Sequence, residues 1–217
     1  MGRIIQFPAR LPAKFGFEPA KKRNADDQHQ LNLFSSRLTE IRRLPADISP
    51  FEEALLLDER NDCGAEKLYR RAILEGDLVA DAYCNLGIIE SEAGRTTKAF
   101  DCFTKSLEHD SRHFESHYNL GNLYFEGDNL RLARMHYEFA GEINPTFPNL
   151  YFNLGLVLAL LGERQAAIDA FVKYQLLAPP EERRNADDLL DGLRRALSAT
   201  GRNTSAPTGV RRQEKDL

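Results

Sequence analysis

Apolar and small residues recur at helical spacing through the middle of the chain, and the whole pattern repeats. The tripeptide Asn-Leu-Gly begins at residues 85, 119 and 153, so each copy follows the previous one by 34 residues. A small and then an aromatic residue follow each copy: Ala99 and Phe103, Ala133 and Tyr137, Ala167 and Phe171. Apolar positions three or four apart indicate amphipathic helices. A fixed interval of this length indicates a helix pair stacked on copies of itself.

Glycine and proline mark where the helices of each unit end. Gly94, Gly127 and Gly162 stand between the two helices of a unit, where we expect a left-handed C-cap. Pro145 and Pro179 end second helices. Within the helices, we expect Gly121 to let the two backbones of its pair approach closely.

These repeats resemble the tetratricopeptide family over residues 46–181. The resemblance implies an all-α, right-handed superhelix (α-solenoid) of helix pairs. Its predicted parts are a degenerate unit at 46–79, full units at 80–113, 114–147 and 148–181, and a C-terminal capping helix within 182–198. Pro8, Pro12 and Pro19 interrupt the start of residues 1–45, and the tail 199–217 lacks apolar periodicity. We therefore expect both ranges to be largely disordered, with a possible short docking helix within 1–45.

The resemblance also implies a binding site, because such arrays take peptides on a concave groove lined by the first helix of each unit. The residues it places there are Asn85, Asn119, Asn122, Asn153, Tyr118, Phe125, Phe152 and Glu115. A ladder of amides can donate to and accept from the backbone of an extended peptide. The alternative is that the asparagines are solvated and bind nothing. The family's lysine and arginine clamp for a C-terminal carboxylate is absent from the three clear units.

Charge and composition narrow the class of partner. The chain has 42% hydrophobic residues and a formal charge of −4, and the first 23 residues are basic while the repeat body is acidic. We therefore expect a neutral or basic protein or peptide partner, not nucleic acid. No membrane helix and no signal peptide is expected, and three cysteines without a CxxC pair suit a reducing compartment, so the predicted location is cytoplasmic.

No catalytic signature stands out in the sequence. It has no phosphate-binding glycine loop after a strand, no HExxH motif and no nucleophile elbow. His109, His113 and His117 are spaced by four, but a turn between units interrupts them, so we interpret them as surface histidines. We expect a protein that is not an enzyme, with no cofactor, no metal and no small-molecule substrate.

One short motif lies outside the repeats. Gln30-Leu31-Asn32-Leu33-Phe34 resembles the pentapeptide by which bacterial proteins bind the replication sliding clamp. Gln30, Leu31, Leu33 and Phe34 would make the contacts. The alternative is a short amphipathic helix that docks on the first repeat. The functional prediction is therefore a non-catalytic interaction module that binds a peptide in its groove, with a replication- or transcription-linked accessory factor as the alternative.

Overall fold

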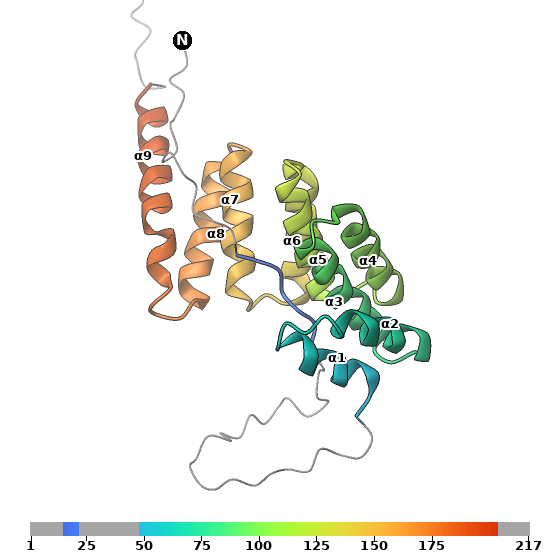
Figure 1. Cartoon of the computed structure of the whole chain (residues 1–217). Coiled ribbons are helices and arrows are strands. Elements are labelled where there is room, and N and C mark those ends of the chain that lie inside the picture. The colour runs from blue at the N-terminus through green and yellow to red at the C-terminus, as the bar shows by residue number, and fades with distance from the viewer. Residues whose placement is uncertain (1–14, 22–47, 204–217) are drawn as a thin grey trace, which may run out of the picture. The chain divides into compact units, whose positions relative to one another are not determined.

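All regular structure among residues 15–21 and 48–203, which the computed structural model describes, is helical (Figure 1). The elements are α1 (Pro50–Asp58), α2 (Ala65–Glu75), α3 (Val79–Glu92), α4 (Thr96–His109), α5 (Phe114–Glu126), α6 (Leu130–Ile143), α7 (Pro148–Leu160), α8 (Arg164–Leu177), the 3-10 turn η1 (Arg183–Ala186) and α9 (Asp187–Asn203). The start of α1 is capped, since Ser49 forms a capping box with Glu52.

The described residues form two compact units, which we describe separately. The larger unit begins at Gly16 and ends at Pro145, and the smaller unit contains Phe15 and the residues from Thr146 onward. In the larger unit the pairs α1/α2, α3/α4 and α5/α6 stack through contacts of α2 with α3 and of α4 with α5. In the smaller unit α7 pairs with α8, and η1 and α9 pack on α8. These stacked helix pairs with a C-terminal helix confirm the predicted all-α fold class.

The repeated glycines face aromatic rings. A Cβ added at Gly121 would lie 2.5 Å from Cε1 of Tyr137. The equivalent atom at Gly87 would lie 2.8 Å from the ring of Phe103, and at Gly155 it would lie 2.8 Å from that of Phe171. At Gly121 the atoms that an added Cβ would meet first are those of the Tyr137 ring, and the expected close approach of the two helix backbones stays a prediction. The glycine and the aromatic residue recur together because the glycine has no side chain in the space that the ring occupies.

The turns inside the helix pairs use the left-handed conformation at one position of the repeat. Gly94 and Gly162 have φ angles of 73° and 81°, as predicted. Gly127 has φ −80°, and the next residue, Asp128, has φ 56°. The prediction for Gly127 is wrong because Asp128, not Gly127, stands one period from Gly94 and Gly162.

Both ends of the helical region differ from the sequence expectation. Helix α9 continues to Asn203, into the range where a disordered tail was expected. Leu189, Leu190 and Leu193 of this helix are buried. Residues 15–21, within the predicted disordered range 1–45, are described and have no regular secondary structure. The motif 30–34 lies outside the described residues, so its two interpretations stay predictions.

Candidate functional site

In the larger unit, three asparagines hold the backbone of an extended segment that comes from the start of the chain. Asn85 lies on α3, and Asn119 and Asn122 lie on α5. Together they form what we call the asparagine face, and it contacts residues 16–20, drawn in blue in Figure 1. The side chains therefore reach the segment from the first helix of two successive helix pairs.

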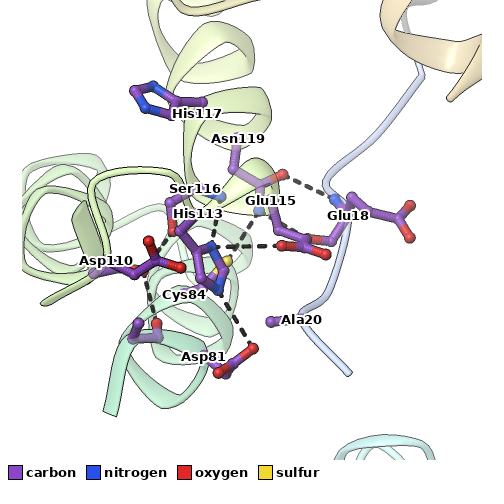
Figure 2. Close-up of polar contacts among 12 residues, drawn as sticks. Glu18, Ala20, Asp81, Cys84, Asp110, His113, Glu115, Ser116, His117 and Asn119 are labelled. Carbon is purple, nitrogen blue, oxygen red and sulfur yellow. Dashed lines mark hydrogen bonds and ion pairs between the residues drawn. The ribbon is translucent and has the colours of Figure 1, made fainter. Parts of the chain in front are cut away.

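Two of these asparagines bond both backbone groups of one residue. The Glu18 N–H donates to Oδ1 of Asn119 at 2.8 Å, and Nδ2 of Asn119 donates to the Glu18 carbonyl at 2.9 Å (Figure 2). Asn85 does the same with Ala20, at 2.8 Å and 2.9 Å. Each amide thus acts as a neighbouring strand residue does in a hydrogen-bonded pair of an antiparallel sheet.

The bonded residues alternate along the segment. Asn122 adds a third contact, because its Nδ2 donates to the Gly16 carbonyl at 2.9 Å. In an extended chain the backbone groups of alternate residues point to the same side. Gly16, Glu18 and Ala20 therefore present one edge of the segment to the asparagine face. These contacts read the backbone and demand no particular side chain.

The smaller unit repeats the same contact. Asn153 on α7 accepts from the Phe15 N–H at 2.9 Å and donates to the Phe15 carbonyl at 3.1 Å. The Phe15 ring meets the Phe152 ring edge to face, with centroids 5.1 Å apart, and lies 5.9 Å from the Tyr174 ring. In this unit an amide holds the backbone and two aromatic rings hold the side chain.

Side chains of the segment belong to the core of the larger unit. Ala20 is fully buried in a cluster with Cys84, Ala99 and Phe103. Phe17 packs against this cluster and stacks on Phe103 at 6.2 Å between ring centroids. Because Ala20 is fully buried, a larger side chain at residue 20 would have to displace its neighbours, so the segment contributes an aromatic residue and a small one to this core.

The asparagines are buried, which the alternative of solvated side chains did not anticipate. Asn85, Asn119, Asn122 and Asn153 each have an exposed fraction of 0%. No buried side-chain nitrogen or oxygen among the described residues lacks a hydrogen-bond partner. Because a buried amide without partners is costly, the segment and the asparagines satisfy each other.

Tyrosines from the second helices orient two of the amides. The Tyr137 hydroxyl donates to Oδ1 of Asn122 at 2.6 Å. Nδ2 of Asn85 donates to the Tyr69 hydroxyl at 3.1 Å, and that hydroxyl donates to Asp58 at 3.0 Å. Burial raises the pKa of Tyr69 above its ordinary value, and the Asp58 carboxylate adds to the effect. The Tyr69 hydroxyl therefore stays neutral, and each of the two hydroxyls holds an amide in a fixed orientation.

Acidic groups surround the segment. Burial raises the pKa of the Glu18 carboxyl, the Lys21 ammonium opposes this shift, and the Glu115 carboxylate adds to it. Figure 2 shows Glu115 beside Asn119 on α5. Glu115 also lies 3.5 Å from Nδ1 of His113. The segment thus places one carboxylate where burial disfavours its ionised form.

A cavity of about 370 Å³ lies beside the segment in the larger unit. Phe17, Pro19 and Lys21 line one side of it, and Asp58, Glu59 and Glu92 lie on its other walls. Burial raises the pKa of Asp58. This cavity offers room beside Pro19 and a set of carboxylates that favours positive charge.

The remaining predicted contact residues lie elsewhere on the same helix. Tyr118 is 1% exposed and packs on the rings of Phe114 and Tyr137. Phe125 is half-buried near the end of α5. Sequence reasoning missed Phe15 and Phe17 of the segment, and the Phe-Gly-Phe pattern was the one signal that could have found them.

Two of the histidines are not at the surface, which corrects the sequence interpretation. His113 and His117 are 2% and 8% exposed. His113 caps α5 by accepting from the Ser116 N–H at 3.2 Å, and His117 lies 3.1 Å from Nδ1 of His136. Burial lowers the pKa of His117 and lowers that of His136 to about 4. No group of metal-binding side chains occurs in 15–21 or 48–203.

Comparisons with known proteins agree with the repeat pattern. A family model described as "Tetratricopeptide repeat" matches residues 80–113 and 148–180. Tetratricopeptide repeat protein 8 of Mus musculus is 30% identical over 100 residues, which make up 46% of this chain and 19% of that protein. The chain thus spans less than a fifth of the length of this curated relative.

Solved structures share the fold at low sequence identity. A crystal structure of MamA is 20% identical with a TM-score of 0.52, covering 75% of this chain and 100% of that chain. A second MamA structure is 19% identical with a TM-score of 0.54, covering 77% and 96%. The first TPR of Spaghetti (RPAP3), bound to the HSP90 peptide SRMEEVD, is 21% identical with a TM-score of 0.51, covering 55% and 93%. No helix in the described part of the chain is long and apolar enough to cross a membrane.

Proposed function

Because the chain is a tetratricopeptide repeat protein, we propose that it is a non-catalytic protein–protein interaction module that binds an extended peptide through its first-helix asparagines. The observation that carries the proposal is the double hydrogen bond of Asn119 with Glu18, repeated by Asn85 with Ala20. This geometry suits any extended backbone, since these hydrogen bonds engage only backbone groups of the segment.

Charge and the asparagines themselves limit the kind of peptide. The relative bound to SRMEEVD takes a strongly acidic peptide. In this chain Glu115, Asp58 and Glu92 lie around the seated segment, so a similar acidic tail would meet like charge. We infer that the partner segment is neutral or basic and is held internally along its backbone, not by a terminal carboxylate.

The test selects random peptides on the full chain and measures their affinity for variants. Changing Asn85 and Asn119 to alanine removes up to four hydrogen bonds, so we expect a loss of roughly tenfold or more. Helical circular dichroism should be retained. Leu74→Ala on α2 is the matched control, because Leu74 is 87% exposed. Equal affinity of the selected peptides for all three proteins would rule out the asparagine face as the site.

A further inference from the structure

The asparagine face is occupied by the chain itself. Gly16, Glu18 and Ala20 take the hydrogen bonds that a partner backbone would need, and Phe17 and Ala20 fill the adjoining apolar space. A second peptide cannot bond the same amides at the same time. Any outside ligand of this face therefore has to displace residues 16–20.

We propose that residues 16–21 are an intramolecular ligand that competes with the partner, and that the partner segment belongs to the same class. This proposal rests on the proposed function of the asparagine face. The class is an extended segment with an aromatic residue, a small residue three positions later and a basic residue after that. Phe17, Ala20 and Lys21 define it in this chain.

Each position of the class follows from a contact. The aromatic residue stacks on Phe103, and the small residue fits a fully buried site beside Cys84. The basic residue takes the place of Lys21, which lines the same cavity as Asp58 and Glu92. The residue that replaces Pro19 is free to be larger, because Pro19 borders the cavity.

Competition within one chain is strong although each contact is modest. The segment joins α1 through residues 22–49, and a tethered ligand competes at an effective concentration on the order of millimolar. The apparent affinity for an outside peptide is the intrinsic affinity multiplied by the fraction of molecules whose asparagine face is free. Partners that bind tightly or are abundant therefore displace the segment, whereas weak binders do not.

The test uses a labelled synthetic peptide with the sequence of residues 12–22. It is titrated into the full chain, into Phe17→Ser, and into Phe17→Ser combined with Asn85→Ala. We expect Phe17→Ser to bind the peptide roughly tenfold more tightly than the unmodified chain, because its own segment is released. Addition of Asn85→Ala should remove that gain. Leu176→Ser is the matched control, since Leu176 is 75% exposed and lies on α8.

Variants of the peptide test the class. Replacement of its Ala20 by leucine should abolish binding, whereas replacement of its Pro19 by leucine should be tolerated. If both substitutions have the same effect, the class is wrong.

The outcomes separate this inference from the proposed function. Equal binding to the unmodified chain and Phe17→Ser, with loss on Asn85→Ala, would overturn competition and leave the function standing. The same holds if the 12–22 peptide binds nothing while selected peptides bind in an asparagine-dependent way. If no peptide binds in that way, both fail. Should Phe17→Ser unfold, hydrogen exchange on the unmodified chain decides: a selected peptide must speed exchange at Glu18 and Ala20, and unchanged exchange overturns the inference.

Discussion

The aromatic ring of Tyr137 explains why residue 121 is a glycine. Gly121 lies under Tyr137, whose hydroxyl in turn holds Asn122. The same tyrosine thus connects the packing of α5 on α6 with the orientation of a contact residue. A change at Gly121 is therefore expected to affect both the stability of the pair and the asparagine face.

We predict that Gly121→Ala destabilises the protein by about 1–3 kcal/mol, although alanine favours helix. The new Cβ would lie 2.5 Å from Cε1 of Tyr137, and the buried ring has little room to move. Denaturant unfolding measures the change. Gly192→Ala is the control, because nothing lies within 4 Å of a Cβ at that position in α9. An unchanged midpoint for Gly121→Ala would show that the ring yields.

Sequence reasoning succeeded at those residues whose role repeats. Asn85, Asn119 and Asn153 recur at one interval, so their common position on first helices could be inferred before any contact was known. The role of Tyr137 could not, because periodicity records that an aromatic recurs but not what it touches. Only the packed structure shows that the ring fills the space left by glycine.

At the level of elements, the turns show how backbone conformation and sequence can disagree. Asp128 adopts the left-handed conformation although glycine stands one residue earlier. Asp128 stands one 34-residue period from Gly94 and Gly162, so the position in the repeat and not the residue type marks the left-handed residue. Local glycine preference was therefore a good guide at Gly94 and Gly162 and a poor one at Gly127.

We predict opposite effects for two glycine-to-alanine changes in the smaller unit. Gly162 has φ 81°, so alanine there is strained and should cost about 1 kcal/mol. Gly192 lies inside α9 with open space around it, so alanine should stabilise by about 0.5–1 kcal/mol. Thermal unfolding of both variants gives the signs. If both variants shift the thermal midpoint in the same direction, only one of the two effects, backbone strain or helix propensity, determines stability at these positions.

For the chain as a whole, the main difference from the sequence-based expectation concerns residues 15–21. Residues 15–21 contain Gly16 and Pro19 and have no apolar period, so local rules predict disorder. Their partners Asn85 and Asn119 stand 65 and 101 residues away from the groups they bond. Local sequence cannot reveal contacts of that range. That the asparagines can bond an extended backbone was predictable, whereas the segment that they bond was not.

The charge on Glu18 should make the binding of the segment to the asparagine face depend on pH. We call the segment seated when it is bound there. Because the pKa of Glu18 is raised when the segment is seated, protonation favours seating, and the penalty for the ionised form develops as pH rises above the ordinary value of 4.5. We therefore predict that Glu18→Gln seats its segment more tightly at neutral pH. The change should lower the affinity of the full chain for an outside peptide.

The measurement is competition with the labelled 12–22 peptide carrying glutamine in place of its own Glu18, so that only the protein titrates at this position. At pH 7 the Glu18→Gln chain should bind this peptide more weakly than the unmodified chain does. As pH falls through the raised pKa, the unmodified chain should approach the variant, because its carboxyl becomes neutral too. Glu115 and His113, which lie near the segment, are the same in both proteins. Glu108→Gln, at an exposed site on α4, should follow the unmodified chain at every pH. Identical curves for Glu18→Gln and the unmodified chain would mean that the Glu18 carboxylate is not disfavoured by its surroundings and that charge does not regulate access to the asparagine face.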